Sequence, residues 1–568
     1  MTPILAALCA FAAYFVAYRF YSGFLAKRIF ALDPNALTPA HTERDEVDYV
    51  PAKPSILFGH HFASITGLAP MLGPAIAVIW GWGPALAWVV LGACLIGCVH
   101  DFSALVLSVR NKGVSVGQVA EGILGARGRT LFHLIIFFGV ALAMGVFIHV
   151  IALLFERVPD PAAGVVGYST AVLPSALLMG VAMACGYLLY RKGFALLPVV
   201  LVGFGIELAS IWLGIRFPTM GLSAELWPDA DGWKWYLLAY AFVASVLPVW
   251  ALLQSRDFLN SLLLYLGLGL AYIGFFVLDP EFAAPAIVFE PEGAPPLLPF
   301  LFITIACGAA SGFHGLVSSG TTAKQLDKEP QARAIGYGGM LGESMLALLA
   351  TLACTAGFAS PDLWHDRYDS WNVAGSLFTK IDSFIGGTTN FVTTLGVPDE
   401  MARALIAMVV VSFALTTLDS ATRLLRFNVE EIAASARIGW LQNRYLSTAI
   451  ACGAIGLFAF YKVDGSPAGL ALWSLFGTTN QLLAGLTLIL VSLYLRKRGK
   501  PILYTLIPAI LMMASTLAAM LFNLRSFAPG GVKEDSLLFS VGGVLLLLGL
   551  WLLVESILIF KQPRATAD

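Results

Sequence analysis

The sequence predicts an all-α polytopic membrane protein with about fifteen transmembrane helices. The prediction starts from composition, because 58% of the 568 residues are hydrophobic and only 12% are charged. It is supported by a mean hydropathy of +0.81. A soluble protein carries about 25% charged residues, so this chain has too few polar side chains to cover a soluble particle of its size. The net charge of −1 gives no electrostatic reason to expect nucleic acid. We therefore expect a lipid bilayer around the chain.

The predicted helices are apolar segments about as long as a bilayer is thick. They cover residues 2–18, 56–80, 84–108, 131–155, 166–190, 194–216, 233–253, 258–278, 299–322, 335–357, 402–425, 446–462, 469–495, 502–524 and 536–560. We divide the chain into four parts. These are an N-terminal helix with a cytoplasmic loop at 1–54, two five-helix repeats at 55–218 and 219–426, and four additional helices at 427–568.

The distribution of basic residues predicts the orientation, because Lys and Arg collect in cytoplasmic loops. With the N-terminus outside, 25 of the 34 Lys and Arg residues fall in inside segments and 9 fall outside. The moderately apolar segment 370–397 would reverse every later loop if it crossed the membrane. We therefore expect it to form an extracytoplasmic re-entrant or surface helix. The C-terminus is then cytoplasmic.

Proline and glycine interrupt two of the predicted spans. The second span breaks at Thr66 and Gly67, and the seventh breaks between Ser245 and Pro248. In lipid, the backbone groups that such breaks release survive mainly where they line a cavity or a ligand site. The two spans are five helices apart and run in opposite directions, which predicts two inverted five-helix repeats with the site between the broken helices. The alternative is that both prolines only kink their helices.

The densest group of polar residues lies at the end of the predicted span 299–322. We take as candidate substrate or ion ligands Ser311, His314, Ser318, Ser319, Thr321 and Thr322. His314 and Ser318 are four residues apart and share a helix face with one of the two threonines. Hydroxyl groups beside an unwound helix suit a monovalent cation or a carboxylate. The alternative is that these small residues only allow close helix packing.

Other ionisable residues at membrane depth are also functional candidates. His60 and His61 open the first broken helix, His100 and Asp101 are adjacent and could share a proton, and Asp419 lies within a span. The structural alternative for His60 and His61 is a contact with lipid headgroups or loop backbone. For His100 and Asp101 it is a polar pair that anchors the end of the helix. For Asp419 it is an ion pair with the arginine four residues later. The spacing of the histidines and cysteines predicts neither a metal site nor a disulfide framework.

Several long polar segments, in order along the chain, resemble the carbon starvation protein A (CstA) family. They are Arg19–Tyr21, Asp45–Pro51, Phe58–Gly67, Gly73–Pro74, Gly97–Phe102, Ser311–Thr322 and Phe476–Gln481. The resemblance implies a bacterial inner-membrane transporter with a LeuT/APC-like core of five-plus-five inverted repeats, discontinuous helices and extra flanking helices. It links the chain to uptake of pyruvate with protons, and to uptake of peptides when carbon is scarce.

From these observations we expect a symporter that imports a small carboxylate such as pyruvate by alternating access. The carboxylate would lie near mid-membrane at half-helix N-termini, between walls at Thr66-Gly67 and Ser245-Pro248. The alternatives are a di- or tripeptide substrate, or a transport-like nutrient sensor. Without a nucleophile–base motif, we do not expect an enzyme. The oligomeric state stays open.

The expected coupling ion is a proton, and we expect no other cofactor. Coupling requires a group whose proton affinity differs between the two states of the transporter. His314 is the first candidate, Asp101 with His100 is the second, and Asp419 is the third. The alternative is Na⁺ held by Ser318, Ser319 and carbonyl groups near Gly67.

Overall fold

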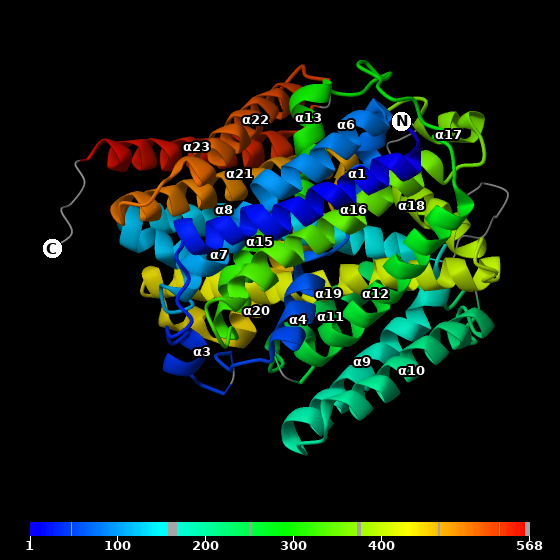
Figure 1. The fold of residues 1–568 in the computed structure, drawn as a ribbon, viewed down its shortest axis with the longest axis horizontal. Coiled ribbons are helices and arrows are strands. Elements are labelled where there is room, and N and C mark those ends of the chain that lie inside the picture. The colour runs from blue at the N-terminus through cyan, green and yellow to red at the C-terminus, as the bar shows by residue number, and fades with distance from the viewer. Residues whose placement is uncertain are drawn as a thin grey trace.

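The protein, seen in a computed structural model, folds almost entirely into helices (Figure 1). The structure describes residues 1–46, 48–156, 167–223, 225–249, 251–371, 377–463, 466–467, 469–532 and 534–562. In this part of the chain the one sheet is a pair of antiparallel strands, β1 (Lys462–Val463) and β2 (Ser466–Pro467).

Eleven segments in these described ranges are long and apolar enough to cross a membrane, and a bent pair of helices makes a twelfth. The eleven contain α1 (Pro3–Val16) with α2 (Ser22–Phe24), α6 (Trp82–Ala87) with α7 (Cys98–Val109), α8 (Val116–Phe155), α9 (Val172–Gly186), α10 (Leu196–Arg216), α12 (Leu253–Leu278), α16 (Gly338–Ala356), α19 (Asp399–Ser435), α21 (Gly469–Lys497), α22 (Leu503–Phe527) and α23 (Ser536–Lys561). The predicted fold class, an all-α polytopic membrane protein, is confirmed.

The remaining three predicted spans also fall on helices, but these are short or interrupted. They are α11 (Ala230–Val246), α20 (Arg444–Ala459), and the series α13 (Leu297–Thr304), α14 (Ala306–Ala309) and α15 (Gly312–Gly320). Short helices outside the predicted spans are α3 (Pro39–Thr42), α17 (Pro361–Tyr368) and α18 (Leu377–Thr393).

The predicted break at Thr66 and Gly67 is present. Helix α4 (Pro54–Ile65) ends there, α5 (Ala69–Ala77) begins after it, and the two segments are bent by 44°. Thr66 has φ −75° and ψ 38°, which leaves helical geometry, and proline stands in the first turn of α5, where its missing N–H costs nothing. The sequence pattern of proline and glycine therefore located this break correctly.

The chain also leaves helical geometry at the second predicted break, because α11 ends at Val246. The break does not divide a single span, however, because the next helix, α12, begins only at Leu253. Leu247 is extended (φ −69°, ψ 149°), as expected for the residue before a proline. The interrupted helix is instead the later series α13, α14 and α15, which was predicted as a polar span.

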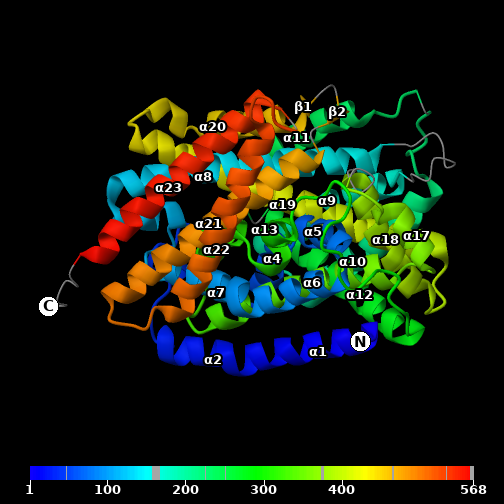
Figure 2. The same cartoon turned by 90° about the horizontal axis from the view of Figure 1, so that it is seen from above.

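Three of the segments predicted to lie on the cytoplasmic face contact one another through Glu329. Asp33 N donates to Glu329 Oε2 over 2.6 Å, and Arg110 Nε donates to Glu329 Oε1 over 2.5 Å. Between two segments predicted to lie outside, Trp371 N donates to the carbonyl of Glu292. The start of α1 and the end of α23 lie at opposite ends of the molecule (Figures 1 and 2).

Helix α18, which covers most of the segment 370–397, is buried rather than exposed at a surface. It packs against α5, α12, α16 and α19. A Cβ on Gly387 would lie 2.2 Å from the carbonyl oxygen of Ala353, and Thr394 Oγ1 donates to the carbonyl of Gly274. These contacts place α18 among the C-terminal ends of α12 and α16. Residues 372–376 of the segment lie outside the described residues.

The helices after the second repeat do not all flank the core. In Figure 2, α1 runs along one edge of the molecule. The most apolar stretch of α21 is completely buried, whereas only a third of that of α23 is buried. Helix α19 runs without interruption from Asp399 to Ser435, so the predicted boundary at 426/427 falls within a helix.

Candidate functional site

The two interrupted helices lie antiparallel with their breaks side by side. His61 Nδ1 lies 2.9 Å from Thr322 Oγ1, whereas further along the first helix a Cβ on Gly73 would lie 2.5 Å from the carbonyl oxygen of Thr304. Residue numbers thus rise along one helix as they fall along the other. The break at Thr66 is therefore level with the break before α15, and the N-terminal ends of α5 and α15 face the same region.

Close packing at the first break requires glycine. A Cβ on Gly67 would lie 2.5 Å from Thr417 Oγ1 of α19 and 3.0 Å from the ring of Phe147 of α8. The hydroxyl oxygens of Thr66 and Thr417 are buried, and neither has a hydrogen-bond partner among the described residues. Polar groups without partners at a helix break are available to a ligand.

The second break is stabilised by Asn480 of α21. Ala310 and Ser311 are extended, with ψ 126° at both. Asn480 Oδ1 accepts from Ser311 Oγ at 3.1 Å and from the backbone N–H of Phe313 at 2.9 Å. Its amide nitrogen donates to Cys307 Sγ. Asn480 thus caps α15 from another helix. The sequence signal was the polar run Thr478–Gln481 in an apolar span, but Asn480 was not among the predicted site residues.

Beside this break, four ionisable side chains form one buried chain that we call the His–acid chain: His100, Asp101, His314 and Glu343. His100 Nδ1 lies 2.7 Å from Asp101 Oδ1, and His314 Nδ1 lies 2.8 Å from Asp101 Oδ2. His314 Nε2 lies 3.0 Å from Glu343 Oε2. All four side chains are fully buried.

The His–acid chain joins α7, α15 and α16. A Cβ on Gly315 would lie 3.1 Å from the ring of His100, so glycine allows α15 to approach α7. The predicted candidates His100, Asp101 and His314 are therefore brought together. Glu343 was a polar residue within a predicted span, but only the structure places it against His314.

A second buried network lies on the other side of α4. His60 Nδ1 lies 2.8 Å from Asp257 Oδ2, and Ser64 donates to the same oxygen at 3.3 Å. Arg256 donates to Asp257 Oδ1 at 3.0 Å and also pairs with Asp419. Asp419 additionally accepts from the Tyr240 hydroxyl at 2.5 Å. The network ties α4 to α11, α12 and α19.

This network bears on the alternative that Asp419 forms an ion pair with the arginine four residues later. The partner of Asp419 is Arg256, not Arg423 four residues on. Arg423 instead donates to the carbonyls of Ala244 and Leu247, at 2.9 and 2.5 Å, and so caps the C-terminus of α11. His60 and His61 are adjacent in sequence, but they reach different helices.

The remaining predicted ligands do not form a single cluster. Ser245 Oγ lies 3.4 Å from Thr448 Oγ1 of α20, and Pro248 follows the end of α11, so neither forms a wall at the break. Ser319 Oγ donates to the carbonyl of Gly315 and accepts from a backbone N–H of α8. Thr321 donates to the carbonyl four residues earlier.

Ser318 differs from these hydroxyl residues, because its oxygen is buried and has no partner within the described ranges. It lies one helical turn after His314 on the predicted common face. Among the described residues, no group of three His, Cys, Asp or Glu side chains could hold a metal ion.

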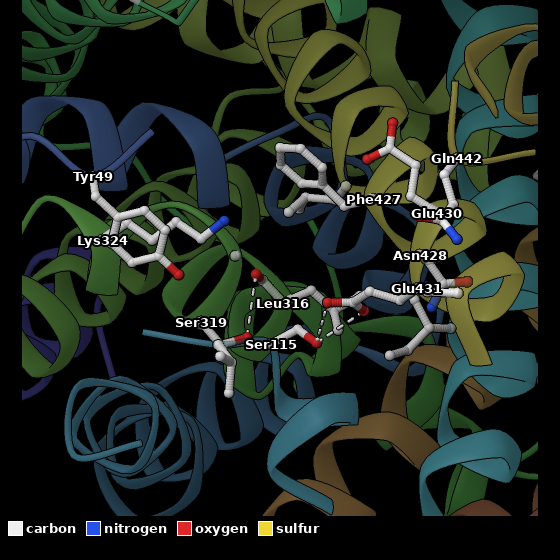
Figure 3. A pocket seen from close by; sticks show the side chains of 15 residues that line it. Tyr49, Ser115, Leu316, Ser319, Lys324, Phe427, Asn428, Glu430, Glu431 and Gln442 are labelled. Atoms are coloured by element: carbon white, nitrogen blue, oxygen red, sulfur yellow. Dashed lines mark hydrogen bonds between the residues drawn. The ribbon is translucent and has the colours of Figure 1, made fainter. Parts of the chain in front are cut away.

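A pocket of about 380 Å³ opens beyond the end of α15, where α8 begins and α19 ends (Figure 3). Its polar and charged lining consists of Tyr49, Ser115, Ser319, Lys324, Asn428, Glu430, Glu431 and Gln442. It lies at the end of the bundle that is predicted to face the cytoplasm. Through Ser319 and Gly320 it borders the same helix that carries His314.

Antiparallel broken helices in an all-helical membrane bundle, with buried ionisable groups beside the break, define the class: a membrane transporter of the broken-helix type. A family described as carbon starvation protein CstA matches residues 2–365 and 372–519. The chain belongs to this family.

Its relatives are named as transporters. The peptide transporter CstA of Helicobacter pylori (strain ATCC 700392 / 26695) is 32% identical, covering 89% of this chain and 79% of the relative. The pyruvate/proton symporter BtsT of Escherichia coli (strain K12) is also 32% identical, covering 91% of this chain and 81% of the relative. A solved manganese transporter of Eremococcus coleocola, in complex with an aromatic bis-isothiourea substituted compound, aligns with a TM-score of 0.42 and 10% identity, over 91% of this chain and 99% of that one.

Proposed function

We propose that the protein imports a small carboxylate such as pyruvate, together with protons, by alternating access across the bacterial inner membrane. The N-terminus is outside and the C-terminus is cytoplasmic, as the distribution of basic residues favours. The His–acid chain is the observation that carries the proposal. The name of the Escherichia coli relative supports the same substrate and ion.

The His–acid chain supports proton coupling through its charge balance. With both carboxylates ionised, the chain is neutral only when both imidazoles are protonated. A buried net charge is costly in the low dielectric of the membrane, so gain or loss of a proton favours one conformation over another. His314 is the central group, because its two ring nitrogens lie 2.8 Å from Asp101 and 3.0 Å from Glu343.

The breaks support an anionic substrate. Because the interrupted helices are antiparallel, the N-terminal ends of α5 and α15 point toward one region. Helix N-termini carry free N–H groups and the positive end of the helix dipole, which favour a carboxylate. The hydroxyls of Thr66 and Thr417, which lack partners among the described residues, add donors at the first break.

One alternative to the proposed coupling ion and one to the proposed substrate are also supported by specific observations. The hydroxyls of Thr66 and Ser318, without partners in the described ranges, would suit Na⁺ as the coupling ion. The name of the Helicobacter pylori relative favours a short peptide as substrate. Transport rather than catalysis agrees with the names of both relatives.

The proposal is tested by uptake of labelled pyruvate into proteoliposomes under an imposed pH gradient, with and without Na⁺. We expect accumulation that depends on the pH gradient and not on Na⁺. His314→Gln should abolish it, whereas His149→Gln should not, because His149 lies on α8 outside the His–acid chain. Accumulation driven only by Na⁺ would instead favour the hydroxyl groups as the ion site. No pyruvate uptake under either gradient would contradict the carboxylate proposal and direct the assay to dipeptides.

A further inference from the structure

A second pocket, of about 240 Å³, lies at the end of the bundle that is predicted to face outside, where α16 ends and α19 begins. We call it the arginine pocket, because Arg367 of α17 and Arg403 of α19 line it, together with Asp382 and Gly386 of α18. In Figures 1 and 2, α17 and α18 lie toward the same end of the molecule as the N-terminus. None of the lining residues belongs to a helix break or to the His–acid chain, so this is a different site.

One of the two arginines is already neutralised by a buried carboxylate. Arg367 Nη1 donates to Asp382 Oδ2 at 2.9 Å, and the hydroxyl of Tyr168 donates to Asp382 Oδ1 at 2.6 Å. Asp382 is 7% exposed, so both of its oxygens have protein partners in a place that is largely closed to water. The charges of Arg367 and Asp382 therefore compensate each other.

The other arginine has no comparable partner. Among the described residues, the only ion pair of Arg403 is a 3.9 Å contact between its Nε and Asp399, whose side chain is 68% exposed. An exposed contact of this length contributes little. Arg367, Asp382 and Arg403 are the charged residues of the lining, so two positive charges and one negative charge leave a net charge of +1. The pocket therefore favours a ligand with one negative charge.

The groups packed behind the lining do not cancel this charge. Lys380 of α18 is fully buried, and its Nζ donates to the carbonyl of Arg367 at 2.7 Å and lies 3.5 Å from the centre of the Tyr368 ring. No carboxylate in the described part of the chain forms an ion pair with Lys380, which therefore fixes α17 in place without neutralising it. Three acidic residues on or next to α17 are exposed and do not line the pocket: Asp362, Asp366 and Asp369.

The chemistry of the lining favours a carboxylate with a single charge. A guanidinium group matches the planar geometry of a carboxylate with two parallel hydrogen bonds. A cation would meet Arg403, and a second carboxylate on the ligand would meet Asp382. The volume is below the 300–1,000 Å³ that is typical of sites for drug-sized ligands, so the ligand is small. A Cβ on Gly386 would meet no atom within 4 Å, so the backbone of α18 is open to the ligand there.

The arginine pocket is connected to the first helix break through α5. The hydroxyl of Tyr368, the neighbour of Arg367, donates to the carbonyl of Ala75 at 2.9 Å, and α18 also packs against α5. Ala75 is six residues after Ala69, the first residue of α5, so it lies about 9 Å along the helix from the break. An anion at the outer end of the bundle is thus one short helix away from the proposed substrate site.

We propose that the arginine pocket is an outer binding site for a small monocarboxylate, held chiefly by Arg403 with Arg367 beside it. The identity of this ligand as cargo rests on the proposed function, whereas the charge of the pocket does not. The unpaired positive charge raises the local concentration of the anion at the entrance. Import then begins with a binding step outside the helix breaks.

The test measures how fast a thiol reagent modifies a cysteine placed in the pocket. Gly386→Cys in nanodiscs, where both faces are accessible, is treated with N-ethylmaleimide with and without pyruvate. At a pyruvate concentration ten times its Kd, the rate should fall about tenfold, because only the empty pocket reacts. Leu363→Cys, 49% exposed on α17 outside the pocket, should react at an unchanged rate, and the unmodified protein gives the background from the exposed Cys9.

Other solutes test the charge and the chemical class of the ligand. Neutral pyruvamide, the dianion malonate and chloride should each protect Gly386→Cys less than pyruvate does. No protection by pyruvate, or equal protection by pyruvamide, would overturn the proposal, and equal protection by chloride would overturn the assignment to a carboxylate. Asn390→Cys, at an exposed position in the lining, is a second reporter in case Gly386→Cys does not fold.

Variants of Arg403 then assign the charge to this side chain. Arg403→Gln should remove the protection by pyruvate, and Arg403→Lys should retain part of it. Arg216→Gln, at the exposed end of α10 outside the pocket, should retain all of it. In proteoliposomes, Arg403→Gln should raise the KM for pyruvate with little change in the maximal rate, because it removes a binding interaction only. Full protection in a folded Arg403→Gln variant would overturn the assignment.

This inference and the proposed function fail in different ways. His314→Gln leaves the arginine pocket intact, so protection by pyruvate should persist in this variant even though uptake is lost. Protection without pyruvate uptake under either gradient would support the outer site and contradict the proposed function. Uptake of pyruvate without protection of either reporter cysteine would overturn the outer site and leave the proposed function standing.

Discussion

Replacing Asp101 with asparagine is the sharpest perturbation of the His–acid chain. Asn keeps the shape of the side chain but removes the charge between two imidazoles, at 2.7 and 2.8 Å. Hydrogen bonds to charged groups contribute about 1.5–3 kcal/mol each, and breaking a buried ion pair costs about 3–5 kcal/mol. We therefore expect Asp101→Asn to lower the free energy of unfolding by no more than about 3–5 kcal/mol, because Asn retains one acceptor.

The same variant should uncouple transport. If one proton enters with each carboxylate, the cycle is electroneutral, and a gradient of about one pH unit supports about tenfold accumulation. Asp101→Asn should reduce this ratio to about one, with exchange of labelled for unlabelled pyruvate retained. The assays are pyruvate accumulation in proteoliposomes and thermal unfolding in nanodiscs, followed by tryptophan fluorescence.

Glu207→Gln provides the matched control. Glu207 is 1% exposed on α10, and both of its carboxylate oxygens lack a hydrogen-bond partner in the described part of the chain. The same change from carboxylate to amide should therefore leave stability unchanged or raise it, because an unpaired buried carboxylate stabilises nothing. The reasoning is refuted if Asp101→Asn retains full gradient-driven accumulation, or if it loses no more stability than Glu207→Gln.

Three further variants test the packing around the breaks. Gly67→Ala should abolish uptake, because its Cβ would lie 2.5 Å from a threonine oxygen, whereas Gly180→Ala, with nothing within 4 Å, should be tolerated. Asn480→Ala should lower the unfolding temperature, because the cap on α15 contributes about 1–2 kcal/mol of stability. Asn480→Asp should keep most of that stability. Equal losses in the two variants would contradict the cap. Arg256→Met should destabilise the protein by about 3–5 kcal/mol, because it leaves the carboxylates of Asp257 and Asp419 unpaired. Adding Asp419→Asn should recover part of this loss. If thermal unfolding shows no recovery, the ion pair between Arg256 and Asp419 is contradicted.

The sequence by itself determined the membrane class, the positions of the helical spans and the first helix break. These features depend on local quantities: apolar length, charge, and proline or glycine at a given position. It also identified His100, Asp101 and His314 as candidates, because an ionisable residue in an apolar span is recognisable without knowing its partner.

Only the tertiary structure decided which helix carries the second break and which groups meet. Pro248 ends a helix instead of interrupting one, a distinction that depends on where the next helix begins. Glu343, Asn480 and Arg256 reach partners far away in sequence, and a single sequence contains no signal for such pairs. The physical reason is that a buried polar group is satisfied in three dimensions, by whichever helix the packing brings beside it.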